Sequence, residues 1–203
     1  MTAINFYLQV IRALEEIQAP YMIVGAFGGL AYGITRATFD VDILVDLREQ
    51  DFEALAKRFP APRYYADPEM MRNSTRDGIM FNIIDSELGV KADLVPLTRE
   101  PDYEQAFSRR VRQSVQDESG PAFDAWYALP ADIIIGKLRA WTEGRSAKHP
   151  SDILSILLFS MSGLGDQPID YQSVSVQAAR MGNQTSKLWQ ELLARAKRES
   201  GST

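Results

Sequence analysis

Two acidic side chains near the start of the chain are spaced for metal chemistry. Asp40 and Asp42 open the apolar segment 40–45, which is predicted to be a strand. Side chains alternate between the faces of a strand, so both carboxylates point to the same side, roughly 7 Å apart along the backbone. A preceding apolar strand at 21–24 runs directly into Gly-Ala-Phe-Gly-Gly at 25–29. Paired carboxylates beside a glycine-rich turn suit a divalent cation and a phosphate chain.

A third carboxylate lies on a predicted hairpin. The segments 81–85 and 90–95 are predicted strands, joined by Ser-Glu-Leu-Gly at 86–89. Asp93 is the only acid within the second of these strands. If this strand lies beside the strand of Asp40 and Asp42, three carboxylates converge. At about 4 Å and an effective dielectric constant near 20, each pair of bare charges costs about 4 kcal/mol, so the cluster needs cations or protons.

This order of residues resembles the polymerase-β-like nucleotidyltransferases. Their signature is a strand that ends in small residues, then Asp-h-Asp (h is apolar), then a lone Asp on a later strand. The version here, Val-Gly-x-x-Gly-Gly-x-Ala-x-Gly-x-x-Arg-x-Thr-x-Asp-Val-Asp at 24–42, is most similar to the bacterial AbiEii-type branch. Many members of that branch are toxins of toxin–antitoxin pairs. The resemblance covers residues 20–95 and continues more weakly through 129–132, 137–138 and 145–154.

Two residues depart from the family pattern. Ala26 stands where the second small residue is Gly or Ser, which removes a hydroxyl contact to phosphate. An alternative placement of the glycine signature uses Gly28 and Gly29, but Gly25 and Ala26 follow the strand directly. His149 follows Lys148 where the family has Asp, whereas Asp152 is retained.

The resemblance implies a fold, an activity and a set of site residues. The fold is of the α/β (α+β) class, a nucleotidyltransferase-fold mixed sheet flanked by helices, with a C-terminal helical subdomain. The activity is transfer of a nucleoside monophosphate from an NTP to an acceptor hydroxyl, with release of pyrophosphate. The acceptor is an RNA such as tRNA, a protein or a small molecule, and a toxin would have an antitoxin protein as partner. The site residues are Asp40, Asp42 and Asp93 as catalytic ligands of two Mg²⁺ (or Mn²⁺) ions, and Gly25, Ala26, Arg36, Thr38 and Lys137 for nucleotide binding.

Several of these side chains have a structural alternative. Arg36 neutralises phosphate charge or pairs with Asp40 or Asp46. Lys137 reaches the nucleotide or lies along its helix with a solvated tip. Asp46 shares the strand face of the carboxylates but is expected to cap the next helix. The basic residues at 109, 110 and 112 bind an RNA backbone or form a solvated helix end.

Two further residues are expected to have structural roles. His149, the only histidine, is expected to be structural, because a multi-histidine metal site cannot be built from one residue. Ser151 is a predicted helix N-cap.

Composition sets limits on these interpretations. A chain of 203 residues, 45% apolar and 24% charged, forms one or two globular domains. The absence of cysteine excludes disulfides and thiolate metal sites, and fits a reducing, cytoplasmic location. No signal peptide or membrane span is expected. A net charge of −5 argues against a protein that coats nucleic acid by bulk attraction.

Hydrophobic periodicity and chain breakers predict the layout. We expect a nucleotidyltransferase core at 1–128 and a helical subdomain at 129–203, with a proline-punctuated loop over 60–68. The predicted helices are 4–17, 27–32, 49–59, 104–109, 130–142, 151–161, 171–181 and 186–198. The predicted strands are 21–24, 40–45, 81–85, 90–95 and 123–127, the last of them at the sheet edge.

Two other classes of function are compatible with the same residues. One is a catalytically weak nucleotide- or partner-binding module on the same fold, which the departures at Ala26 and His149 favour. The other is a glycosyltransferase that binds a sugar nucleotide through manganese at its Asp-x-Asp. The second is disfavoured, because no long nucleotide-binding βαβ region precedes the aspartates.

Overall fold

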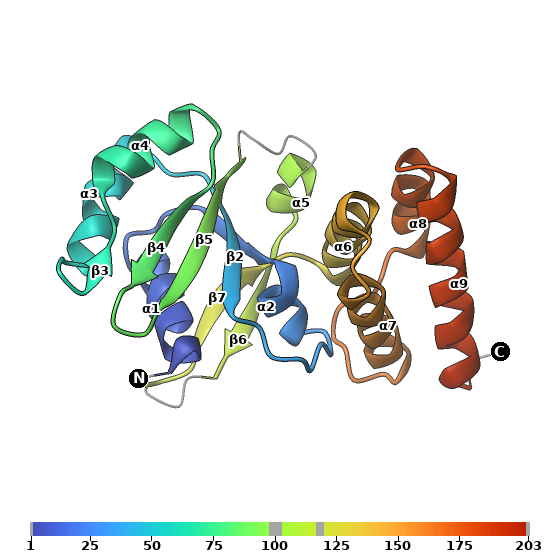
Figure 1. Cartoon of the computed structure of the whole chain (residues 1–203). Coiled ribbons are helices and arrows are strands. Elements are labelled where there is room, and N and C mark those ends of the chain that lie inside the picture. Colours follow the sequence, from blue (N-terminus) through green and yellow to red (C-terminus); the bar gives the residue numbers. More distant parts are fainter. Residues whose placement is uncertain (1, 98–102, 117–119, 202–203) are drawn as a thin grey trace. The chain divides into compact units, whose positions relative to one another are not determined.

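The computed structural model describes residues 2–97, 103–116 and 120–201, in which helices and strands are mixed up to β7 and only helices follow it (Figure 1). The helices are α1 Ala3–Glu16, α2 Gly25–Leu30, α3 Glu49–Arg58, α4 Pro68–Arg76, α5 Glu104–Ser108, α6 Pro130–Gly144, α7 Lys148–Met161, α8 Tyr171–Arg180 and α9 Asn183–Glu199. The strands are β1 Tyr21–Val24, β2 Asp40–Val45, β3 Tyr64–Tyr65, β4 Phe81–Asp85, β5 Val90–Pro96, β6 Val111–Val115 and β7 Phe123–Tyr127.

The described strands form one seven-stranded sheet in the order β3-β4-β5-β2-β1-β7-β6. Strand β1 runs antiparallel to β2, whereas β2 runs parallel to β5 and β1 runs parallel to β7. The mixed α/β class predicted from the sequence is therefore confirmed. The prediction that the strand at 123–127 lies at the sheet edge is wrong, because β6 pairs with its outer side.

The chain divides into two compact units. Unit 1 contains Met1–Phe27 and Thr38–Tyr127, and unit 2 contains Gly28–Ala37 and Ala128–Thr203. The two-domain division at residues 1–128 and 129–203 stays a prediction, and the segment 28–37 groups with the C-terminal helices. In the parts of the chain that the structure describes, every helix is too short or too polar to span a bilayer.

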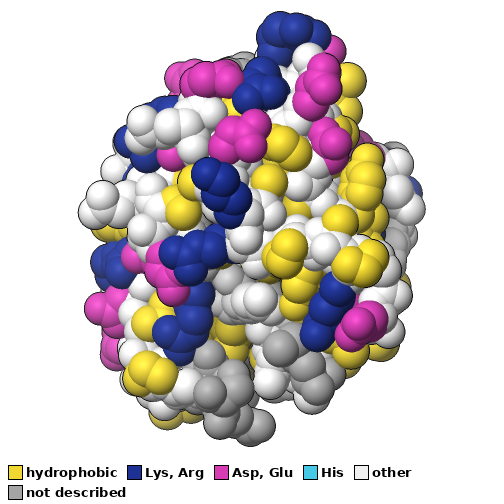
Figure 2. Space-filling view, turned by 90° about the vertical axis from the view of Figure 1, so that its left-hand side faces the viewer, with side chains coloured by type: hydrophobic (Ala, Val, Ile, Leu, Met, Phe, Trp, Pro, Cys, Tyr) yellow, Lys and Arg dark blue, Asp and Glu magenta, His cyan; other side chains and the backbone are white. Residues whose placement is uncertain are grey.

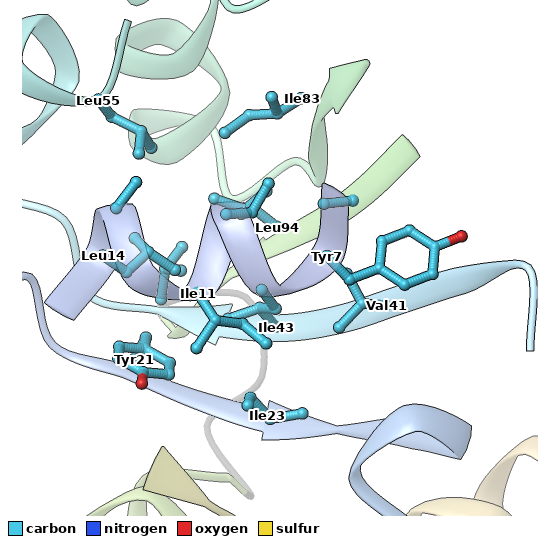
Figure 3. Packing of buried hydrophobic residues seen from close by; sticks show 14 of the residues in the cluster. Tyr7, Ile11, Leu14, Tyr21, Ile23, Val41, Ile43, Leu55, Ile83 and Leu94 are labelled. Atoms are coloured by element: carbon cyan, nitrogen blue, oxygen red, sulfur yellow. The ribbon is translucent and has the colours of Figure 1, made fainter. Parts of the chain in front are cut away.

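In unit 1, helix α1 covers one face of the sheet. Thr2 caps the helix by accepting a hydrogen bond from the backbone N–H of Asn5, and the apolar residues of the helix are buried at helical spacing. Figure 3 shows Ile11 of this helix beside Val41 and Ile43 of β2, all three fully buried. Because residues 41 and 43 face the helix, Asp40 and Asp42 project from the opposite face of the sheet.

Helices α3 and α4 lie beside the β3 edge of the sheet (Figure 1). Asp51, rather than Asp46, accepts a hydrogen bond from the backbone N–H that opens α3, so the predicted capping role of Asp46 is wrong. Helix α4 directly follows the predicted proline loop over 60–68 and shares only Pro68 with it. Pro68 begins it because a proline at the first helical position needs no N–H partner, and Asp67 caps it.

Basic and acidic side chains are interspersed over this face of the molecule (Figure 2), as in the ion pair of Arg72 on α4 with Glu49.

Unit 2 is helical. Tyr32 ties the segment 28–37 to the C-terminal helices through a hydrogen bond from its hydroxyl to the carbonyl of Ala128. Trp189 of α9 is fully buried, and its indole N–H donates to the hydroxyl of Ser175. Helix α7 begins at Lys148, so the prediction that Ser151 is its N-cap is wrong.

Candidate metal and nucleotide site

The pairing register places the three predicted carboxylates on one face of unit 1. Strands β2 and β5 are adjacent and parallel, with Asp42 directly opposite Asp93. Neighbouring strands are about 4.8 Å apart, so these two side chains are neighbours. Asp40, two residues before Asp42, lies on the same face. The expected neighbourhood of the hairpin and the Asp-x-Asp strand is therefore present.

A glycine at the end of β1 makes close contact with this face. Gly25 has a positive φ of 66°, and Val24 before it pairs with Asp42. A Cβ atom at residue 25 would lie only 2.0 Å from Oδ2 of Asp42. Only glycine therefore fits here, both for its backbone conformation and for the position of the carboxylate. Ala26 follows and is buried.

Asp93 is buried but fully engaged by polar neighbours. The Lys91 ammonium lies 2.7 Å from Oδ1 and 2.6 Å from Oδ2, and the Asn82 amide donates to Oδ1 at 2.5 Å. Sequence reasoning missed both neighbours. Two signals could have found them: Lys91 is two residues from Asp93 and so shares its face, and the hairpin register pairs Asn82 with Asp93.

Asp40 is held by the residue that precedes its strand. The Thr38 hydroxyl lies 2.9 Å from Oδ1 of Asp40 and 3.0 Å from its carbonyl oxygen. This hydroxyl therefore orients a carboxylate of the cluster. The expected contact of Thr38 with a nucleotide stays a prediction.

The field of these carboxylates reaches the core beneath them. Burial, and to a smaller extent the charges of Asp40 and Asp93, raise the pKa of Tyr7. Its hydroxyl is buried without a hydrogen-bond partner among the described residues. In Figure 3 this hydroxyl points away from Ile11 and Ile43, past Val41. The phenol of Tyr7 therefore stays protonated beside an acidic region.

The donor set suits a hard divalent cation. Carboxylate oxygens are the ligands that Mg²⁺ and Mn²⁺ prefer, and an ammonium group already lies against one of the three carboxylates. Within residues 2–97, 103–116 and 120–201, no three His, Cys, Asp or Glu side chains are gathered closely enough to enclose an ion as they stand. The three carboxylates are therefore of the right chemical type for a divalent cation and lie on one face of the sheet. Their side chains are oriented toward other partners.

The two predicted cationic ligands of the nucleotide, Arg36 and Lys137, lie in unit 2 and meet at one buried carboxylate. Asp152 accepts two hydrogen bonds from the Arg36 guanidinium, both of 2.8 Å, and one of 2.6 Å from Lys137. Lys137 is only 5% exposed, so the alternative of a solvated tip is wrong. Burial acts to raise the pKa of Asp152, but the hydrogen bonds from Arg36 and Lys137 outweigh it and lower that pKa.

His149 lies close to the same charges. Burial, followed by the positive charges of Lys137 and Lys148, lowers its pKa, so the imidazole is neutral at pH 7. Its Nδ1 is buried without a partner among the described residues. The expected structural role of His149 stays a prediction.

The predicted basic cluster has partners within unit 1. Arg112 lies on β6 and holds both carboxylate oxygens of Glu15 at 2.7 and 3.0 Å, so the alternative of a solvated helix end is wrong for it. The Arg110 guanidinium lies 4.2 Å from the ring centre of Phe107 and 4.7 Å from that of Trp126. An RNA contact of this cluster stays a prediction.

Comparison with known proteins finds similar solved structures but no similar sequence. No protein-family model matches the chain, and no curated protein matches its sequence. The solution structure of the antibiotic-resistance factor ANT(2'')-Ia is 14% identical with a TM-score of 0.48, over 99% of this chain and 97% of that chain. The crystal structure of ANT(2'')-Ia in complex with adenylyl-2''-tobramycin is 14% identical in sequence with a TM-score of 0.47. The match covers 87% of this chain and 94% of that chain.

A third structure gives a similar result. An antigenic nucleotidyltransferase-like protein from Paracoccidioides brasiliensis is 15% identical with a TM-score of 0.48, over 96% of this chain and 87% of that chain.

Proposed function

We propose that unit 1 carries the active site of a metal-dependent nucleotidyltransferase. The observation that supports this most directly is the register of Asp42 opposite Asp93, with Asp40 on the same face and Gly25 against Asp42. Three carboxylates on adjacent strands repel one another, at a cost of about 4 kcal/mol for a bare pair at about 4 Å. Such an arrangement is stabilised by cations, and Mg²⁺ or Mn²⁺ is the cation that a triphosphate brings with it.

The reaction follows from these residues. Two bound metal ions would stabilise both the attacking and the leaving oxygen of an in-line displacement. The acceptor hydroxyl forms a bond to the α-phosphorus, and the bond from that phosphorus to pyrophosphate breaks. We assign the hydroxyl proton to the carboxylate of Asp93. Thr38 orients Asp40, and the backbone amides of Gly25 and Ala26 are proposed phosphate contacts, because neither residue has a bulky side chain.

A nucleotide-binding role for Arg36 and Lys137 is a separate part of the proposal. These two cations meet at the carboxylate of Asp152, so two positive charges are gathered at one place in unit 2. Lys137→Met is expected to weaken NTP binding, measured by calorimetry on the full chain. Unchanged NTP affinity in a folded Lys137→Met variant would restrict Lys137 to a structural role.

The experiment that tests the proposed activity is a transfer assay. The protein is incubated with each α-labelled NTP, with Mg²⁺ or Mn²⁺, and with pools of tRNA and total protein. The double variant Asp40→Ala/Asp42→Ala removes ligands, and Asp46→Ala is the matched control, since Asp46 is exposed just after the same strand. Label on an acceptor with wild type and Asp46→Ala, but not with the double variant, supports the proposal.

Two other outcomes decide against transfer. Metal-dependent NTP binding that the double variant loses, without labelled acceptor, would identify a catalytically weak nucleotide-binding module instead. Equal NTP binding and equal label transfer by the double variant and wild type would refute the proposed metal site.

The AbiEii-like order of residues extends the proposal to a toxin of a toxin–antitoxin pair. Its acceptor would then be a tRNA or a protein, and an antitoxin protein would be its partner. Expression in a bacterial host is expected to arrest growth, and Asp42→Asn is expected to restore it. Growth arrest that persists with Asp42→Asn would contradict this extension.

A further inference from the structure

Lys91 occupies a central position on the carboxylate face of unit 1. On β5 it lies two residues before Asp93, so both side chains share one face of the sheet. Across the strand pair it lies directly opposite Asp40. Lys91 is thus a close neighbour of two carboxylates of the cluster, along its own strand and across to the next.

The ammonium of Lys91 bridges Asp93. Its Nζ lies 2.7 Å from one carboxylate oxygen and 2.6 Å from the other, while the Asp93 side chain is only 8% exposed. Asn82 also donates to Oδ1. Both oxygens that a metal ion would need from Asp93 therefore already face a cation.

We propose that Lys91 is the internal counter-ion of the acidic cluster. It neutralises Asp93 while no divalent cation is bound, and it leaves that carboxylate when a metal ion binds. This inference rests on the proposed function, since it takes Asp40, Asp42 and Asp93 as the ligands. Lys91 is a positioning residue: it offsets the repulsion among the three carboxylates and holds Asp93 in place without a metal, and it opposes metal binding by competition.

The chemistry of lysine suits such a role. Its charge sits at the end of a flexible stem, so the ammonium can leave Asp93 without movement of the strand. The Lys91 side chain is 46% exposed, so the released ammonium can be hydrated. An ion pair with one half-exposed partner is also weak enough for a divalent ion to displace.

The test is a calorimetric titration of Mn²⁺ into the full chain without nucleotide. Lys91→Met is expected to bind Mn²⁺ about fivefold more tightly than wild type, the factor that corresponds to a weak ion pair. Lys91→Arg, which keeps the positive charge, is expected to bind like wild type. The matched control is Lys57→Met, an exposed lysine of α3 in the same unit, which is expected to change nothing.

A second readout is thermal stability. Without divalent cation, Lys91→Met is expected to melt below wild type, because Asp93 stays buried without its counter-ion. Saturating Mn²⁺ is expected to close this difference, whereas a purely structural lysine would leave it unchanged.

The remaining outcomes separate the two proposals. If wild type binds Mn²⁺, Asp42→Asn abolishes binding and Lys91→Met binds no more tightly than wild type, the role of Lys91 is refuted and the metal site stands. If no variant binds Mn²⁺ and Asp42→Asn resembles wild type, the metal site and the role of Lys91 both fail.

Discussion

Replacement of Gly25 by alanine is expected to damage the site by moving one carboxylate. The new Cβ would lie 2.0 Å from Oδ2 of Asp42, whereas real Cβ contacts are essentially never below 3.0 Å. The carboxylate must therefore move by at least the difference, 3.0 − 2.0 = 1.0 Å. A misplacement of about 1 Å in a catalytic constellation costs about 100-fold in rate. We expect a loss of this size in nucleotidyl transfer, together with weaker Mn²⁺ binding.

A matched variant separates this effect from backbone strain. Gly89, in the turn between β4 and β5, has a φ of 64°, close to the 66° of Gly25. A Cβ atom at residue 89 would have no neighbour within 4 Å. In both variants an alanine must adopt the left-handed conformation, at a cost of about 1–2 kcal/mol. Urea unfolding is therefore expected to show similar backbone-strain losses for Gly25→Ala and Gly89→Ala.

We expect Gly25→Ala and Gly89→Ala to differ in metal binding and in activity. Mn²⁺ titration and the transfer assay should show Gly89→Ala close to wild type and Gly25→Ala strongly impaired. Equal metal affinity and equal activity of the two variants would refute the reasoning. The contact between residue 25 and Asp42 would then not matter for function.

Three further predictions concern single residues. Asp42→Asn is expected to abolish Mn²⁺ binding in calorimetry while the far-UV circular dichroism stays unchanged. Asp152→Asn removes the negative charge that pairs with Arg36 and with the buried Lys137, and is expected to lower the free energy of unfolding by about 3 kcal/mol in urea. The pKa of Asp152 is lowered in the folded state, so its contribution is complete above the ordinary value of 3.8 and is lost as the pH falls through the lowered pKa. Acid titration should accordingly show a smaller loss of stability for Asp152→Asn than for wild type. Gly33→Ala would place a Cβ atom 2.4 Å from Cβ of Phe159 and is expected to cost more stability than Gly163→Ala, whose new Cβ would contact nothing.

Local patterns in the sequence were enough to predict most elements. The apolar spacing from residue 4 to 17 predicts α1 within one residue at each end, because a buried helix face repeats with the helical period. The hairpin of β4 and β5 follows from two apolar runs around a short polar turn. Helix α4 was missed because its one proline, Pro68, was interpreted as a loop residue, although it stands at the start of the helix, where proline is favoured.

The order of residues along each strand is enough to predict which side chains share a face of the sheet. Alternation along a strand places Asp40 with Asp42, and Lys91 with Asp93, whatever the rest of the chain does. The position of β5 next to β2, with Asp42 opposite Asp93, follows from the packing of the whole sheet. Periodicity acts over a few residues, whereas strand order depends on how distant segments bury their apolar faces together.

The same distinction applies to the charged residues. Arg36 and Asp152 are 116 positions apart in the chain, and no local pattern relates them. Lys137 was recognised as a lysine among apolar residues, but its burial against Asp152 results from the packing of α6 on α7. A buried charge needs a partner, so the sequence can indicate that one exists. Which residue provides it is decided by the fold.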